Sequence, residues 1–245
     1  MYKKEITKLG IMQPYFFPYV GYFALINQVD LFVLLDTVQF MRHSWIERNQ
    51  MLKATGKPLY IKAPLVKHRR TTTIDDIFIR NEEPWKNKIL AQLTPYKKKA
   101  PNYYKVVGLL REIFELDTNS IVELNQYALL KVCQYLHINT PIKIWSEMNI
   151  EIDSVNAPDE WALNISKALG ADMYINTDAG RELFNHEKYQ SAGIDLKFIE
   201  VKPIPYKQLL SEEFVPNLSI LDILMFCDLE ETHRMLDNYK LTDKW

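Results

Sequence analysis

An unusual run of proline and aromatic residues near the N-terminus is the first candidate for a binding site. The run, QPYFFPYVGY, covers residues 13–22. Its prolines restrict the backbone, and its glycine permits a close approach of the backbone to a ligand. Tyrosine rings can stack on a base or a sugar, and a strand, turn and helix N-terminus can hold a phosphate. The binding candidates are Gln13, Tyr15, Tyr19, Gly21 and Tyr22. The alternative is that the rings fill the core, which we expect of Phe16 or Phe17.

Polar and charged residues that follow this run supply the candidates for catalysis. Asp36 could order a substrate amine or act as a base. His43 is a second candidate for proton transfer, although its place beside Arg42 equally fits a surface histidine. Arg48 suits a pyrophosphate because a guanidinium makes forked contacts to oxyanions. The catalytic candidates are therefore Asp36 and His43, and the further binding candidates are Gln39, Arg48 and Asn49.

Three buried strands are expected to bring such residues together. Apolar runs at residues 9–12, 31–35 and 173–175 are followed by Gln13, Asp36 and Asn176. Ligands of open parallel sheets bind outside the carboxyl ends of the strands, so these three side chains should face one crevice. Polar residues also end strands for ordinary turn reasons. Asn217, in a loop before a C-terminal helix, is either a helix cap or a further residue of the crevice.

The remaining elements alternate with these strands. Weaker strand patterns lie at 196–199 and around 59–61, and helical patterns cover residues 22–29, 83–98, 102–116, 119–137 and 160–169. Asn119 or Ser120 could cap one of these helices, Asp159 could cap another, and Gly170 should end it. The order predicts a three-layer α/β fold, with a mostly parallel sheet and helices on both faces. We expect one domain over residues 1–245, with a helical insertion at about 80–140.

Composition excludes several classes of protein. Hydrophobic residues make up 47% of the chain and the formal net charge is −1, which argues against disorder and against generic nucleic-acid binding. Residues 41–70 nevertheless carry eight basic side chains and one acid, a segment that either holds an anion or is a solvated face. Two isolated cysteines, no signal-peptide pattern and no apolar run of spanning length predict a soluble cytoplasmic protein.

Other kinds of active site find less support. Asp178, Glu182 and His186 would share one face of a continuous helix, but this spacing is common by chance and we expect no metal site. Cys133 lies in an apolar helical pattern, where burial makes a thiol inert. The chain has no Walker A or GxGxxG phosphate loop, which counts against a kinase or a dinucleotide enzyme.

These residues resemble those of a known family. The run at 12–23, followed by Asp36, Gln39, Trp45, Arg48 and Asn49, closely resembles the WbqC-like protein family. The resemblance continues at residues 62–64, 96–101, 170–172, 174–176, 193–194, 196–198, 205–206 and 214–222, and at Gly180. It covers essentially the whole chain.

The resemblance implies a role in bacterial surface-polysaccharide synthesis, such as O-antigen formation. It implies a transferase that adds an aminoacyl or acyl group to a nucleotide-linked amino sugar. The resemblance does not identify catalytic residues or a cofactor, and the cofactor and the oligomeric state stay unassigned. We expect a small-molecule substrate, with no nucleic-acid partner and no membrane span. The alternatives are a nucleotidyltransferase-like enzyme that uses a nucleoside triphosphate, or a non-catalytic binding protein of glycan assembly.

Overall fold

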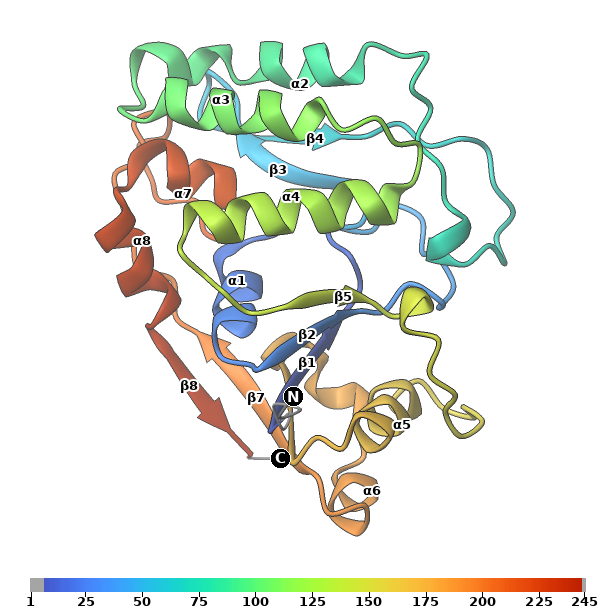
Figure 1. Ribbon diagram of the computed structural model, residues 1–245. Helices are drawn as coiled ribbons and strands as arrows, with labels where there is room; N and C mark the ends of the chain where they lie inside the picture. The colour runs from blue at the N-terminus through green and yellow to red at the C-terminus, as the bar shows by residue number, and fades with distance from the viewer. Residues whose placement is uncertain (1–6, 244–245) are drawn as a thin grey trace.

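A six-stranded sheet forms the centre of the computed structural model, which describes residues 7–243 (Figure 1). The strand order is β5-β2-β1-β6-β7-β8, and every neighbouring pair is parallel except β7 and β8. The strands are β1 (Lys8–Met12), β2 (Leu31–Leu34), β5 (Ile142–Ile144), β6 (Met173–Thr177), β7 (Asp195–Val201) and β8 (Tyr239–Thr242). The expected mostly parallel sheet is therefore confirmed.

Four of the five predicted strands lie in this sheet, at β1, β2, β6 and β7. The fifth, around residues 59–61, is β4 (Pro58–Lys62), which instead pairs antiparallel with β3 (Arg48–Leu52) in a separate hairpin. Strands β3, β5 and β8 were not expected from the sequence. They are short and contain charged or amide side chains, so they lack the continuous apolar pattern of a strand covered on both faces.

Helices cover both faces of the sheet. Alternate residues of a strand point to opposite faces, so each apolar strand supplies side chains to a core on either side. Phe32 and Leu34 of β2 pack in the larger core, which includes α1 (Val20–Asn27) and α8 (Leu229–Leu236). Leu31 and Val33 pack on the other side, in the smaller core with α5 (Glu160–Leu169) and α6 (His186–Ser191). The three-layer α/β arrangement predicted from the sequence is confirmed.

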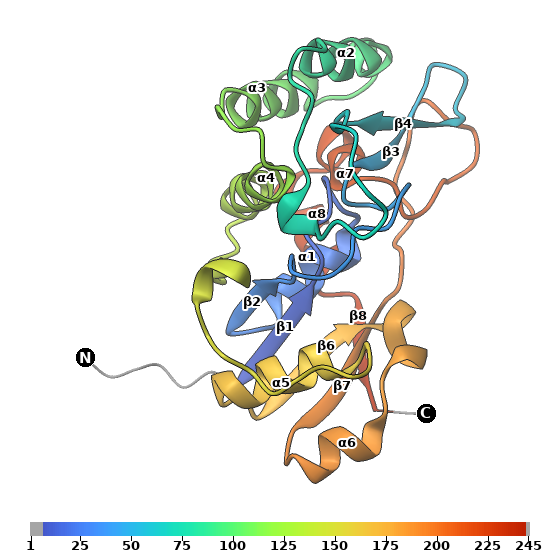
Figure 2. The same cartoon turned by 90° about the vertical axis from the view of Figure 1, so that its right-hand side faces the viewer.

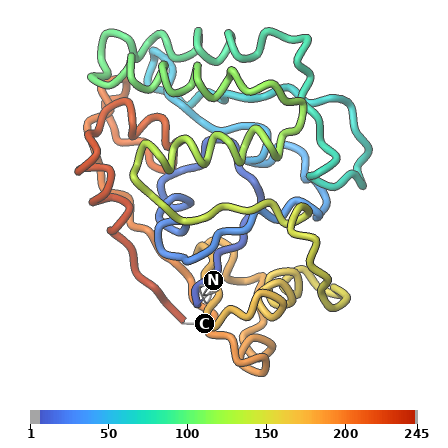
Figure 3. The backbone as a smooth tube through the Cα atoms, in the orientation of Figure 1, coloured from blue at the N-terminus to red at the C-terminus, as the bar shows by residue number. Residues whose placement is uncertain are grey.

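A hairpin and a block of helices separate β2 from its parallel neighbour β5, as the tube in Figure 3 shows. The helices are α2 (Trp85–Gln92), α3 (Tyr103–Phe114) and α4 (Ile121–Tyr135), with the 3-10 turns η1 (Ile74–Asp76) and η2 (Thr94–Lys98). The helix predicted over 83–98 is divided between α2 and η2. Pro95 explains the break, because a proline clashes with the carbonyl four residues earlier in an α-helix.

Two of the expected helix ends are confirmed and one is wrong. The Ser120 hydroxyl accepts the backbone N–H of Glu123 at the start of α4, and Gly170 ends α5 with a φ of 65°. Asp159 does not cap α5 with its side chain. Its carboxylate instead accepts the Asn185 N–H and forms an ion pair with Lys188, because both groups approach it from α6.

A long strap, residues 202–219, joins β7 to α7 (Ile220–Phe226) and passes beside the β3–β4 turn (Figure 2). A buried carboxylate anchors it. The hydroxyls of Tyr96 and Tyr206 donate to Asp222 at 2.5 and 2.6 Å, and Gln208 Nε2 donates at 3.1 Å. Within residues 7–243, no helix is long and apolar enough to cross a membrane.

Candidate functional site

A cleft opens at the carboxyl ends of β1 and β6, where the strand order changes direction. From β1 the chain continues to β2 on one side, whereas β6 pairs with β1 on the other. This switch point is where open α/β sheets bind their ligands. The cleft has two adjoining parts, which we call the large compartment (about 920 Å³) and the small compartment (about 480 Å³). Both are lined by Met12, Tyr15, Thr177 and Ala179.

The large compartment is apolar, with amides placed among the hydrocarbon side chains. Trp161, Leu183 and Phe184 provide much of its wall, and Met41 and Leu183 are 61% and 64% exposed at its rim. The amides come from Gln13, Gln39, Asn156 and Asn176. Among the described residues, those that line it include no charged side chain. This surface suits an uncharged ring or chain that needs a few oriented hydrogen bonds.

The small compartment combines aromatic rings with acids. Tyr15, Tyr19 and Trp45 line it together with Asp178 and Glu200. None of the lining residues in the described part of the chain is basic. The compartment therefore favours a ligand group that is positively charged or rich in hydrogen-bond donors.

The two tyrosines remain protonated in this setting. Burial raises the pKa of Tyr15, and burial together with the nearby Tyr15 and the Asp178 carboxylate raises the pKa of Tyr19. Both phenols are therefore hydrogen-bond donors at neutral pH. Tyr15 lines both compartments, so it can contact a ligand that spans them, and its predicted position in the crevice fits the structure.

Buried amide and hydroxyl groups hold the aromatic run in place. Asn49 Nδ2 donates to the carbonyls of Phe16 and Phe17 at 3.1 and 2.9 Å, where Phe17 adopts a φ of 42°. Ser219 Oγ donates to the same Phe17 carbonyl, and the Tyr22 hydroxyl donates to the Gln13 carbonyl. Asn49 lines the small compartment with its amide already engaged, and Tyr22 is fully buried. We therefore assign them as positioning residues, where the sequence predicted ligand contacts.

Gly21 also has a different role from the predicted one. It lies in the first turn of α1, and a Cβ added there would stand 2.4 Å from the ring of Tyr19. The missing side chain leaves room for that ring, which lines the small compartment. Gly21 thus permits the close approach of an aromatic wall and does not itself line either compartment.

Asp36, a predicted catalytic residue, turns away from the cleft. It is 1% exposed, and its carboxylate accepts the Ser146 N–H and hydroxyl at 3.1 and 2.5 Å. Burial raises its pKa, which the two Ser146 hydrogen bonds partly offset. The carboxyl ends of β2 and β5 are neighbours in the sheet, so Ser146, just after β5, lies next to Asp36 and occupies its carboxylate. Of the three predicted strand-end groups, only Gln13 and Asn176 line a common cavity.

His43 and Arg48 lie outside both compartments as well. The His43 side chain is 79% exposed, which corresponds to the surface alternative. An Arg48 terminal nitrogen donates to the His43 carbonyl at 2.8 Å, and its guanidinium lies 4.2 Å from the centre of the Tyr60 ring. Arg48 is therefore held near β4 by these two contacts and not directed into the cleft, although its buried Nε has no hydrogen-bond partner among the described residues.

The remaining predicted residues border the cleft. Asn176 Nδ2 donates to the Tyr174 hydroxyl, and its oxygen accepts the Thr177 N–H at 2.6 Å, so its orientation is fixed. Gln39 Nε2 donates to the Arg70 carbonyl at the edge of the large compartment. Asn217 lies in the strap with a φ of 57° and lines the small compartment.

Among the aromatic and acidic residues of the small compartment, three were not identified as ligand contacts from the sequence. Trp45 carried only part of the family resemblance, and Asp178 was considered only for a metal. The helix needed for that metal site is interrupted, because η4 (Asp178–Leu183) ends before α6 begins. Glu200 lies near the end of β7, so the rule applied to the other strand ends could have found it. Cys133 is buried, and burial raises its pKa to about 12, as expected for an inert thiol.

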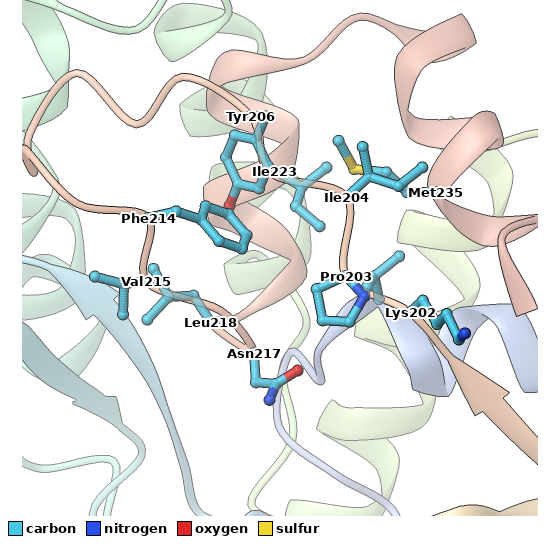
Figure 4. A pocket seen from close by; sticks show the side chains of 11 residues that line it. Lys202, Pro203, Ile204, Tyr206, Phe214, Val215, Asn217, Leu218, Ile223 and Met235 are labelled. Carbon is cyan, nitrogen blue, oxygen red and sulfur yellow. The ribbon is translucent and has the colours of Figure 1, made fainter.

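The strap closes one side of the small compartment and packs over a minor cavity of about 20 Å³, enough for a single water (Figure 4). Tyr206 and Phe214 lie edge to face there, with ring centres 5.4 Å apart, and Asn217 lines both this cavity and the small compartment. The position of Asn217 in the cleft thus depends on the anchoring of the strap by Asp222.

Comparison with known proteins gives a family and a distant relative. The family model of the WbqC-like proteins matches residues 13–234. The uncharacterized protein Rv1507c of Mycobacterium tuberculosis (strain ATCC 25618 / H37Rv) is 25% identical over 226 residues, which cover 89% of this chain and 93% of that protein. No solved structure matches. Because the family match extends from the aromatic run through most of α8, the chain belongs to the WbqC-like protein family.

Proposed function

We propose that the protein is a transferase that adds an aminoacyl or acyl group to a nucleotide-linked amino sugar of surface-glycan synthesis. The observation that carries this proposal is the cleft at the β1–β6 switch point, with aromatic rings, fixed amides and two carboxylates along its walls. A sugar presents apolar faces for rings and hydroxyls for amides. An amino group adds a positive charge that suits the acids.

Two arginines are close in the chain or by their backbone to residues that line the large compartment, and the phosphates of such a substrate could lie outside its mouth. Arg42 follows the rim residue Met41 directly, and the Arg70 carbonyl is held by Gln39. Arg42 and Arg70 are exposed. This arrangement supports phosphates at the entrance and an uncharged or amine-bearing group inside. The described residues that line the cleft include no basic side chain, so the phosphates of a nucleotide sugar, like those of a nucleoside triphosphate, would have to lie outside it.

Thermal-shift screening against nucleotide sugars tests the proposal. A ligand present at a hundred times its Kd stabilises the folded state by about 2.7 kcal/mol. For a protein of this size, that corresponds to a rise in Tm of roughly 5–10 °C. Tyr15→Ala should abolish the shift, whereas Tyr104→Ala, the same change at a 70% exposed ring on α3, should retain it. Failure of every nucleotide sugar to raise the Tm contradicts the proposal.

A second candidate function is a binding protein that performs no chemistry. It is favoured by the distance of the predicted catalytic groups from the cleft, since Asp36 is engaged by Ser146 and His43 lies on the surface. Mass spectrometry distinguishes the two. A transferase converts a bound amino sugar in the presence of activated acyl donors such as thioesters, whereas a binding protein returns it unchanged with every donor.

A further inference from the structure

The small compartment has the lining of a site for a protonated primary amine. Asp178 follows Thr177 directly, and Thr177 pairs in register with Ile199, the residue before Glu200. Asp178 therefore lies one residue beyond the end of β6, and Glu200 lies at the same level within the neighbouring parallel strand β7, where adjacent strands are about 4.8 Å apart. Both acids line one cavity. Asp178 is paired with Arg181, so the charge that a bound cation would compensate is mainly that of Glu200.

The two carboxylates differ in what already holds them. Arg181 donates from Nε and from a terminal nitrogen to Asp178 Oδ1, at 2.9 and 2.6 Å, so one oxygen of Asp178 is occupied and the side chain is oriented. Glu200 has neither an ion pair nor a side-chain hydrogen bond within residues 7–243. Lys240 stands opposite it in the β7–β8 register, yet the two form no ion pair. Glu200 is thus the acid whose charge is available to a ligand.

Aromatic rings complete the cavity around these acids. Tyr15, Tyr19 and Trp45 supply the electron-rich faces that attract a cation, and tryptophan is the strongest of these. The three N–H groups of a primary ammonium need several acceptors, which the acids, Thr177 and Asn217 can provide. At about 480 Å³ the compartment can hold a sugar ring as well as its amine.

We propose that the small compartment binds the ammonium group of an amino sugar, with Glu200 as its principal charged partner and Asp178 as its second. This inference rests on the proposed function, which it deepens by naming the subsite and the ionisation state of the substrate. It gives Glu200 the amine-orienting role that the sequence assigned to Asp36. The large compartment then receives the uncharged remainder of the substrate or the incoming acyl group.

A matched pair of sugars tests the subsite without any knowledge of the nucleotide or the donor. D-Glucosamine carries the ammonium group at pH 6.5, and N-acetyl-D-glucosamine replaces it with a neutral amide. Each sugar is titrated into the 245-residue protein while NMR follows the Trp45 indole N–H, which should show saturable shifts with glucosamine. Binding of the N-acetyl sugar should be at least about tenfold weaker, because a hydrogen bond to a charged group is lost.

Charge-neutral variants assign the contact to its residue. Glu200→Gln should weaken glucosamine binding by roughly ten- to a hundredfold and leave N-acetylglucosamine unchanged. Glu82→Gln makes the same change at an exposed site outside both compartments, and it should bind both sugars as the parent protein does. The subsite is overturned if glucosamine causes no shift at Trp45 up to about 50 millimolar, if both sugars bind equally, or if the two variants behave alike.

The results also separate this inference from the proposed function. Nucleotide sugars that raise the Tm equally with a free and an acetylated amine would support the function and overturn the amine subsite. Glucosamine binding that depends on Glu200, without a response to any nucleotide sugar, would support the subsite and contradict the function.

Discussion

Substitution of Gly21 by alanine gives the most direct test of how the aromatic wall of the cleft is built. The added methyl group would stand 2.4, 2.7 and 2.8 Å from three atoms of the Tyr19 ring and hydroxyl, well inside contact distance. Overpacking of this kind costs about 1–3 kcal/mol. Alanine is favoured over glycine in a helix by at most about 1 kcal/mol. We therefore expect a net loss of stability of about 0–2 kcal/mol, with the Tyr19 ring displaced.

Gly108 provides a matched control, since it lies within α3 and a Cβ there would meet nothing within 4 Å. Gly108→Ala should stabilise the protein by about 0.5–1 kcal/mol. Because 1 kcal/mol changes the Tm of a domain of this size by roughly 2–4 °C, the two variants should differ measurably. Differential scanning calorimetry gives the Tm, and glucosamine titration reports the loss of the wall in the Gly21 variant.

A double-mutant cycle provides the refutation. When Tyr19→Ala has removed the ring, Gly21→Ala has nothing to displace and should be neutral or stabilising, as Gly108→Ala is. If Gly21→Ala costs the same with and without the Tyr19 ring, the contact does not explain the glycine, and the proposed positioning of the wall is wrong.

Three further variants test the buried polar groups. Asp222→Asn should destabilise the protein by about 1–3 kcal/mol, because the new amide faces the donors of Tyr96, Tyr206 and Gln208. Burial raises the pKa of Asp222, so the free energy of unfolding of the parent should fall as the pH rises from about 4 through that raised value. Urea denaturation at several pH values should show this slope in the parent and not in Asp222→Asn. Asn49→Ala leaves the Phe16 carbonyl unpaired and should cost about 1–3 kcal/mol and weaken sugar binding; unchanged affinity would contradict its positioning role. Ser146→Ala removes a hydrogen bond that lowers the pKa of Asp36, so the variant should be less stable than the parent at pH 7, and this difference in stability should shrink as the pH falls toward about 4. A difference in stability that is independent of pH would refute this role of Ser146.

The elements that the sequence predicted best are those covered on both faces. The apolar runs of β1, β2, β6 and β7 are continuous because helices pack on each side, so their pattern is independent of distant partners. The hairpin strand β3, with the sequence RNQML, has no such pattern. Its position depends on contacts with β4 and α7, which no local pattern contains.

The same distinction explains which of the predicted site residues lie at the cleft and which do not. The strand-end rule placed Gln13 and Asn176 correctly at one cleft, because parallel strands share an edge. It could not show which way Asp36 points, since the group that captures it, Ser146, comes from a distant segment. Arg48 contacts the carbonyl of His43 and the ring of Tyr60 in place of a ligand in the cleft. The partners of both side chains are set by the tertiary structure, which no local sequence pattern contains.

The position of β1 in the middle of the sheet has a consequence for how the chain acquires its structure. β1 and β2 pair with each other early in the chain. Phe32 of β2 also pairs with Ile142, however, and Gly10 of β1 pairs with Ile175, so each of these strands meets its second neighbour only after more than half of the polypeptide has been synthesised. Pairings so remote along the chain slow folding, because the intervening chain must be closed into a loop first. On the ribosome, the β1–β2 pair should therefore keep an open edge on each side until β5 and then β6 emerge, and the helical block between β2 and β5 should fold before the sheet is complete.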